Sequence, residues 1–326
     1  MFYSIRHLTR FRYAAPVRES MMELRMHPRS EGPQRCLGFD VRVTPRARLQ
    51  SYRDYLGNVV HHFDVPGPHR QLIITAEASV DVQPVLEMPY FCGPDAWARL
   101  DNEIAEGDFW EMLAPSQFAQ WNGHIDEFAG ELHLPSAAEA RQWDPLELLA
   151  DVNSRIYSAI EYTPKSTRVD SPVDDALRSR RGVCQDYAHI AIALIRRIGV
   201  PCRYVSGYLF HRDGDKHRSS EGATHAWVEA YLPDVGWIGF DPTNNVRAAE
   251  THVRTAVGRD YADVPPTRGV FKGDASSELT VSVLVAQSDK TPPPEEEIAP
   301  EDSVLMAAES ADDGQAAAQQ QQQQQQ

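Results

Sequence analysis

The chain has 326 residues, of which 42% are hydrophobic, and a formal net charge of −15. This length exceeds that of one typical domain and can supply more than one core. From Ser288 to Gln326, nine acidic side chains stand against one lysine, which accounts for −8 of the charge. The remaining net charge of −7 argues against a nucleic-acid groove in the folded part.

Two further features of the composition concern the compartment. Nowhere do 18 apolar residues run together, and the first residues lack a basic segment followed by an apolar one. Four cysteines are scattered without a tight framework, so reduced thiols are expected. We therefore expect a cytoplasmic protein without a membrane partner; the oligomeric state is left open.

Residues 1–83 predict an N-terminal β domain of the sandwich type. Residues 84–143 are expected to be a connector of short helices, whose aromatic side chains, from Trp97 to Phe128, bury the domain junction. The alternation of apolar and polar residues between turn signals indicates strands. These strands are Phe2–Tyr13, Val17–Met26, Cys36–Thr44, Val59–Val65 and Leu72–Val82.

A helix with both ends marked begins at Cys184. Gly199 and Pro201 end its periodic pattern. Cys184 extends the apolar stripe of this helix by one turn toward the N-terminus, where free N–H groups and the helix dipole favour a thiolate. Taken alone, the residue would be interpreted as a buried thiol that only packs. The stripe consists of Tyr187, Ile190, Ala191, Leu194, Ile195 and Ile198.

A β-hairpin is predicted from Thr224 to Asp241. Its two strands alternate, so that if the aliphatic residues share one face, His225 and Asp241 share the other. A three-residue loop would place Asp241 across from Trp227 and diagonal to His225, within reach of side chains. The pattern therefore brings an imidazole and a carboxylate together.

Cys184, His225 and Asp241 form a candidate catalytic triad. The thiol is the nucleophile, the imidazole takes its proton, and the carboxylate fixes the imidazole tautomer. Alone, His225 could be a hydrogen-bonded core histidine, and Asp241 could be a turn residue before Pro242. Together with the thiol, these simpler interpretations lose weight.

Four ordered motifs carry a family resemblance. They are Gly-Val-Cys-Gln-Asp-Tyr-Ala-His, Ser-Gly-Tyr-Leu, His-Ala-Trp-Val-Glu and Gly-Trp-Ile-Gly-Phe-Asp-Pro-Thr. The region from Asp144 to Asn245 resembles the core of bacterial transglutaminase-like proteins, and the segment from Phe2 to about Val82 resembles the N-terminal β domain that accompanies this core.

The resemblance implies an α+β fold. A β-sandwich-like domain would precede a papain-like core, with the nucleophile at a helix N-terminus packed on an antiparallel sheet. Cys184, His225 and Asp241 match the family triad, and Cys184 would attack an amide of a protein or peptide substrate, form a thioester and pass the acyl group to an amine or to water. No cofactor is implied. The backbone N–H of Cys184 is one candidate oxyanion donor, and no upstream polar residue is marked as a second.

The remaining segments complete the expected layout. A helix starting at Asp144 should pack beside the Cys184 helix within a catalytic core of residues 144–287. Cys202 opens a strand and is expected only to pack. The segments Ala256–Asp263 and Ser277–Val285 are expected to return to the sheet or edge of this core. The acidic, glutamine-rich tail, 288–326, is expected to be disordered.

A metal site is the rival chemistry. Histidines at 189, 211 and 217 could join the triad residues as ligands, but His189 lies five residues along the helix from Cys184, so the two side chains do not converge. We expect no metal, and a hydrogen-bonding role for His189. Asp186 is expected to cap the first turn of the helix.

Several other side chains near these motifs have open roles. Trp227 and Trp237 share the predicted face of the triad and are candidates for walls of the substrate cleft, although packing is an equal alternative. Arg178, Arg180 and Arg181 could attract anionic groups.

The sequence supports two hypotheses of different kinds. The first is a thiol acyltransferase or amide hydrolase, for which the sequence does not choose between water and an amine as acceptor. The second is a catalytically silent peptide-binding scaffold that retains the fold. The reactivity of Cys184 would separate them.

Overall fold

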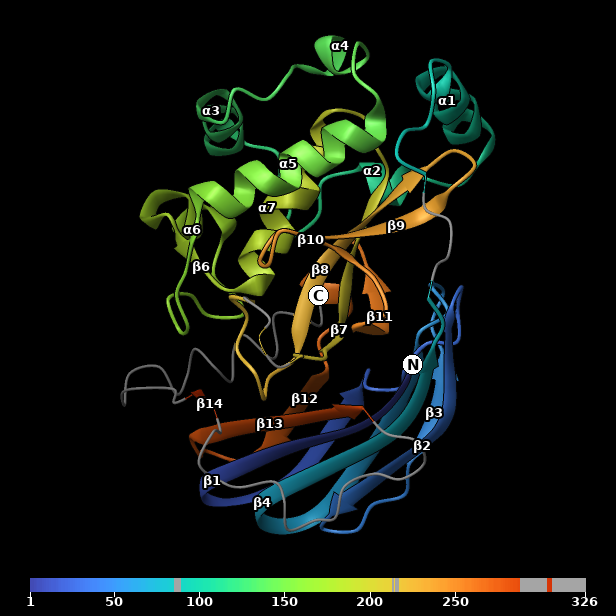
Figure 1. Ribbon diagram of the computed structural model, residues 1–326. Coiled ribbons are helices and arrows are strands. Elements are labelled where there is room, and N and C mark those ends of the chain that lie inside the picture. Colours follow the sequence, from blue (N-terminus) through green and yellow to red (C-terminus); the bar gives the residue numbers. More distant parts are fainter. Residues whose placement is uncertain (85–88, 213, 215–216, 288–303, 307–326) are drawn as a thin grey trace.

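The structure is a computed structural model that describes residues 1–84, 89–212, 214, 217–287 and 304–306. A strand-rich half carries the N-terminus, and a half that combines helices with a second sheet contains Cys184 (Figure 1). The expected α+β organisation is therefore confirmed. Among the described residues, no helix combines the length and apolar composition that crossing a bilayer requires.

The strand-rich half is built on two long antiparallel strands, β1 (Phe2–Leu24) and β4 (Val59–Val82), joined by β2 (Gln34–Thr44) and β3 (Gln50–Arg53), which both pair with β4. The sequence predicted two strands in place of each long one. The pairing is only irregular, not interrupted by a turn, between Arg12 and Val17. A bulge lets a strand bend and continue, so the residues taken for turns lie inside the sheet.

The last strands of the chain return to this half. β12 (Thr267–Lys272) and β13 (Ser277–Gln287) both pair with β1. The prediction that Ser277–Val285 joins the catalytic core is therefore wrong, and so is the end of that core at residue 287. β14 (Val304–Met306) pairs with β13; the rest of the tail for which disorder was predicted lies outside the described residues.

The second sheet has the order β10-β9-β8-β7-β11, with every neighbouring pair antiparallel. β7 coincides with the predicted strand that begins at Cys202, and that side chain is fully buried, as expected. The bounds are Cys202–Leu209 for β7, His225–Leu232 for β8, Gly236–Asp241 for β9, Val246–Ala248 for β10 and His252–Gly258 for β11.

Helices α5 (Pro145–Ala159) and α7 (Cys184–Arg197) pack together over this sheet (Figure 1). Asp144 caps α5 by accepting hydrogen bonds from two backbone N–H groups, and proline occupies its first turn, as the sequence predicted. Between them lie β5 (Glu161–Tyr162), α6 (Val173–Ser179) and β6 (Arg181–Gly182), and β5 and β6 pair in parallel.

Short helices lie between β4 and α5 along the chain, where the sequence predicted a connector. Their aromatic residues do not bury the junction, however: Trp97 and Phe128 lie in the core around α5 and α7, and Trp110 is 65% exposed. That prediction is wrong. The helices are α1 (Ala96–Glu106), α2 (Trp110–Leu113), α3 (Gly123–Glu131) and α4 (Ala137–Ala140), and a 3₁₀ turn, η1 (Tyr261–Asp263), follows β11.

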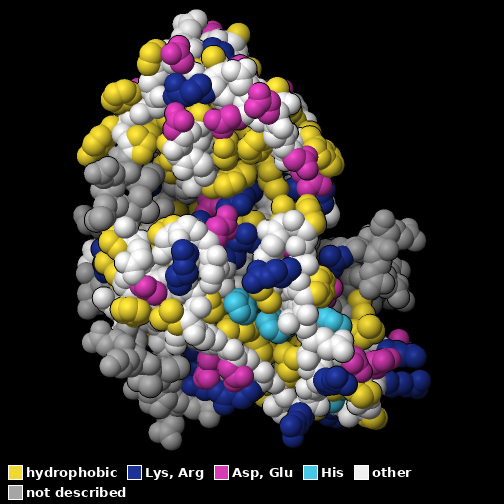
Figure 2. Space-filling view, turned by 90° about the vertical axis from the view of Figure 1, so that its right-hand side faces the viewer, with side chains coloured by type: hydrophobic (Ala, Val, Ile, Leu, Met, Phe, Trp, Pro, Cys, Tyr) yellow, Lys and Arg dark blue, Asp and Glu magenta, His cyan; other side chains and the backbone are white. Residues whose placement is uncertain are grey.

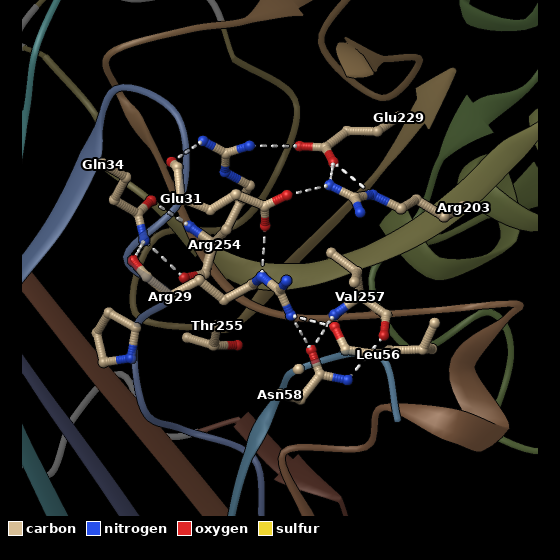
Figure 3. Close-up of polar contacts among 12 residues, drawn as sticks. Arg29, Glu31, Gln34, Leu56, Asn58, Arg203, Glu229, Arg254, Thr255 and Val257 are labelled. Atoms are coloured by element: carbon tan, nitrogen blue, oxygen red, sulfur yellow. Dashed lines mark hydrogen bonds and ion pairs between the residues drawn. The ribbon is translucent and has the colours of Figure 1, made fainter. Parts of the chain in front are cut away.

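The junction combines an apolar cluster, in which Tyr3 and Ile5 of the strand-rich half pack with Tyr208 and Val253 of the second sheet, with a buried ionic network. Glu229, buried at the middle of β8, pairs with Arg203 of β7 and Arg254 of β11, and both arginines reach Glu31 of the strand-rich half (Figure 3). Asn58 adds hydrogen bonds to both backbone groups of Val257. Figure 2 shows basic and acidic side chains gathered in the depression between the two halves. The strand that carries His225 is thus fixed to the other half.

Candidate active site

The nucleophile candidate stands at the first residue of α7. Asp186 accepts a hydrogen bond from the Val183 backbone N–H at 2.8 Å and another from the Thr167 hydroxyl at 2.5 Å. This is the capping role that the sequence predicted. It holds the residue before Cys184 in an extended conformation, while the first N–H groups of a helix have no intrahelical acceptor. The sulfur and the Cys184 N–H therefore lie at the positive end of the helix dipole.

The hairpin that carries the other two residues has the predicted register. Leu232 pairs with Gly236 across a three-residue loop, and Val228 pairs with Phe240. Continued by one residue, this register sets Asp241 opposite Trp227 and diagonal to His225. The aliphatic face packs against α7, and Trp227 packs on the other face.

His225 and Asp241 are in direct contact. The imidazole Nε2 lies 2.8 Å from the Asp241 Oδ2, and both side chains are buried. The other ring nitrogen, Nδ1, is buried and has no hydrogen-bond partner among the described residues. Burial alone would lower the His225 pKa, but the Asp241 carboxylate and then the Cys184 thiol outweigh it and raise the pKa to about 10. The structure therefore brings the three predicted residues together.

Asp241 is held as a carboxylate. Its Oδ1 accepts the backbone N–H groups of Thr243 and Asn244, and its Oδ2 accepts from the Asn244 side chain at 2.7 Å as well as from His225. Burial raises its pKa, but the charge of His225 and the hydrogen bonds from His225 and His252 outweigh burial and hold the pKa well below the ordinary range. An ionised carboxylate only accepts hydrogen bonds, so Asp241 can satisfy every donor around it.

Three tyrosines lie within electrostatic range of the thiol. Burial raises the pKa values of Tyr162, Tyr204 and Tyr261, and the negative charge of Cys184 adds to each shift. Tyr204 and Tyr261 are packed in the core, whereas the Tyr162 hydroxyl lies 3.2 Å from the Ser220 Oγ at the edge of the site. The Cys184 thiol therefore acts electrostatically on two core tyrosines and on Tyr162.

His252, on β11, is a site residue that the sequence analysis missed. Its Nε2 lies 3.2 Å from the Asp241 Oδ2, and its Nδ1 lies 3.2 Å from the Thr251 hydroxyl. Burial lowers its pKa and so favours the neutral ring, which can donate from Nε2. No motif or spacing marks this histidine, because only the pairing of β11 with β7 brings it to the hairpin.

We predict that His252→Ala slows the acylation of Cys184 by about tenfold, the loss of one hydrogen bond to a charged group, and that His252→Gln restores most of the rate. Glutamine can donate to Asp241 from its amide, whereas alanine cannot. Stopped-flow acylation by p-nitrophenyl acetate, run beside thermal melts, measures this. Equal rates for both variants would show that His252 only fills space.

His225, Asp241 and His252 also meet a geometric criterion for a metal site, since their ligand atoms lie within 4.8 Å of one another. The Asp241 Oδ2 already accepts from both imidazoles and from Asn244. A cation there would compete with three hydrogen bonds. The hydrogen-bonded network accounts for these groups without one.

Other predicted site residues lie apart from the thiol. Trp227 is 1% exposed and stacks beside the His225 ring, so it supports the site from behind. Trp237 pairs with Tyr231 near the hairpin turn, under the guanidinium of Arg203. Neither position offers a cleft wall beside the sulfur. His189 accepts the Tyr261 backbone N–H at 3.2 Å, the hydrogen-bonding role expected of it.

Comparisons with known proteins agree with this geometry. Residues 3–81 match the bacterial transglutaminase-like N-terminal region, and residues 136–242 match the transglutaminase-like superfamily. The second match includes Cys184, His225 and Asp241. One match lies in each half of the structure, whereas α1 to α3 and the elements from β10 onward lie outside both.

An uncharacterized protein of Mycobacterium leprae is 33% identical over 282 residues, which cover 86% of this chain and 97% of that protein. A protein-glutamine gamma-glutamyltransferase of Pseudomonas aeruginosa is 32% identical over 108 residues, 31% of this chain and 16% of that protein. A crystal structure of a candidate cysteine protease from Cytophaga hutchinsonii has a TM-score of 0.66 at 23% identity and covers 90% of this chain and 93% of that one. This likeness confirms the papain-like fold. The chain belongs to the bacterial transglutaminase-like family, and this family indicates a thiol-dependent kind of enzyme.

Proposed function

We propose that the protein catalyses acyl transfer or amide hydrolysis through a thioester on Cys184. The observation that carries this proposal is the buried His225–Asp241 pair, whose imidazole keeps one nitrogen without a hydrogen bond while the charge of Cys184 acts on the same ring. An orienting carboxylate on one nitrogen leaves the other for proton exchange with sulfur.

The proposed steps use only these side chains. The His225 Nδ1 takes the thiol proton, and the sulfur attacks the amide carbon of a peptide or of a glutamine side chain. The Cys184 N–H, at the start of α7, stabilises the oxyanion that forms. His225 returns the proton to the leaving amine or ammonia, and the acyl group remains as a thioester.

The thioester is then resolved by a second nucleophile. An amine or a water molecule loses its proton to His225 as it attacks the acyl carbon, and the thiolate leaves. The likeness to the Pseudomonas aeruginosa glutamyltransferase supports a glutamine acyl donor. Amine transfer and hydrolysis differ only in which nucleophile reaches the cleft.

The first test asks whether Cys184 is an activated nucleophile. We expect iodoacetamide at neutral pH to alkylate Cys184 at least about tenfold faster than the other cysteines, because thiolate character controls alkylation. Burial raises the pKa of Cys92 and that of Cys202 to about 11, and it raises that of Cys36. Peptide mapping by mass spectrometry gives the rate at each site.

The second test uses Cys184→Ala in assays for amine incorporation and peptide cleavage with cell lysate as substrate. Loss of turnover, with Cys202→Ala as the matched control, is the expected result. A mass added to Cys184 in the trapped acyl-enzyme would identify the acyl donor. An inert Cys184 with full binding of peptides would instead favour the scaffold hypothesis.

A further inference from the structure

An open cavity of about 710 Å³ lies beside β5 and β6. Its lining includes three arginines from separate parts of the chain: Arg180 and Arg181 after α6, and Arg218 before β8. Tyr162 and Glu161, which form β5, are also among its walls. We call this cavity the arginine basin.

The arginine basin is lined by residues close to the proposed nucleophile along the backbone. Tyr162 pairs with Gly182, two residues before Cys184. The charge of the Cys184 thiol also helps to raise the pKa of Tyr162. Three residues of backbone span at most about 10 Å, so the Arg181 backbone lies within this distance of the Cys184 backbone. A substrate group in the basin can therefore belong to the molecule whose amide reaches the sulfur.

Arg218 is positioned to bind an anion. One of its terminal nitrogens, Nη1, donates to the backbone carbonyls of Tyr157 at 2.7 Å and Ile160 at 3.3 Å, and its guanidinium lies over the Tyr157 ring. Within the described part of the chain, no carboxylate pairs with it. A guanidinium anchored at one nitrogen keeps its others for a planar, two-point contact with a carboxylate.

The two neighbouring arginines add positive charge. Arg180 pairs with Glu131, and Arg181 pairs with Glu161, but all four side chains are more than one third exposed. Exposed pairs of this kind are weak and can exchange partners. Arg180 also adopts a left-handed conformation, with φ of 55°, at the end of α6, where glycine is common. Arg180 thus places a charged side chain at a position where glycine would be favoured.

We propose that the arginine basin binds a carboxylate of the acyl donor, within about three residues of the amide that Cys184 attacks. This inference rests on the proposed function and adds the substrate class: donors that carry either an acidic side chain or a free α-carboxylate close to the reactive amide. The chain as a whole has a charge of −15 and would repel such donors, so the preference must arise locally.

The experiment uses reagents that need no known substrate. Bromoacetyl-Gly-Glu-amide carries a side-chain carboxylate, bromoacetyl-Gly-Gly acid carries an α-carboxylate, and bromoacetyl-Gly-Gln-amide and bromoacetyl-Gly-Gly-amide are their neutral counterparts. We expect at least one acid to alkylate Cys184 of the full chain roughly tenfold faster than its neutral counterpart, the size expected for a charge-assisted hydrogen bond. The faster acid identifies the source of the carboxylate.

Variants assign the preference to the basin. In Arg218→Gln, the ratio of the acid rate to the neutral rate should fall to near one. Arg181→Gln, at a side chain that is 58% exposed, should lower the ratio in part. Arg178→Gln removes the same charge from α6 outside the basin and should leave the ratio unchanged. Circular dichroism melts verify that each variant is folded.

The outcomes separate this inference from the proposed function. If the neutral reagents and iodoacetamide fail to react with Cys184, the proposed function fails. If they react but neither acid is faster in the wild-type chain, the carboxylate site is refuted and the proposed function stands. A preference for acid that survives in both Arg218→Gln and Arg181→Gln also refutes the site.

Discussion

Replacing Asp241 with asparagine is expected to slow acylation of Cys184 by roughly 10³- to 10⁴-fold, the scale of losing an orienting carboxylate from a triad. Each oxygen of Asp241 accepts at least two hydrogen bonds, from backbone N–H groups on one side and from His225, His252 and Asn244 on the other. An asparagine side chain must turn its NH₂ group either toward the backbone donors or toward the side-chain donors. Either the carbonyl no longer faces His225, or the backbone donors lose their acceptor.

The same substitution should change the pH dependence of stability. The His225 pKa is raised from 6.5 to about 10, since Asp241 outweighs the burial that lowers it. A raised histidine pKa stabilises the folded state fully below the unfolded value and loses this contribution as pH rises toward the folded value. The difference in the free energy of unfolding between wild type and Asp241→Asn should therefore shrink from pH 6.5 to pH 10.

Urea titrations at a series of pH values measure the difference in the free energy of unfolding between wild type and Asp241→Asn. Bursts with p-nitrophenyl acetate measure acylation. On the acid side the sign reverses: the lowered pKa of Asp241 stabilises the fold above its ordinary value of 3.8, and this contribution declines as pH falls. Asn244→Ala serves as a control that removes one donor but no charge. An Asp241→Asn enzyme with a wild-type burst rate would contradict the triad.

The hairpin could be predicted because its information is local. Alternation fixed which face His225 and Asp241 share, and the loop between Leu232 and Gly236 fixed the register. The same holds for the caps of α5 and α7, where Asp144 and Asp186 lie within three residues of the groups they bind.

Distant pairing could not be predicted. β13 lies against β1, at the other end of the chain, and no residue of either strand encodes its partner, because any alternating strand can pair with another. His252 is missed for the same reason. The junction was misjudged because aromatic residues signal burial but not where they are buried, whereas Glu229 and Arg203 look like ordinary surface charges in the sequence.

Substitution of Glu229 by glutamine is expected to destabilise the fold by about 3–5 kcal/mol, the cost of removing one partner from a buried ion pair. The Glu229 side chain is 4% exposed and lies 2.7 Å from the Arg203 Nη2 and 3.2 Å from the Arg254 Nη1. Glutamine keeps the shape but turns an NH₂ group toward one guanidinium. At least one buried arginine then faces a donor in place of a carboxylate, and Glu31 is left as the acidic partner.

The surface pair of Asp101 with Arg141 gives the matched control, since Asp101→Asn removes the same charge from a side chain that is 54% exposed and should change stability little. Thermal and urea unfolding compare the two variants. Glu229 lies on the same strand as His225, and its arginines reach Glu31 of the other half. Loss of the pair should therefore loosen the strand that carries the imidazole, and alkylation of Cys184 in Glu229→Gln should slow before global unfolding. Equal unfolding midpoints for the two variants would show that the buried network contributes no more than an exposed pair.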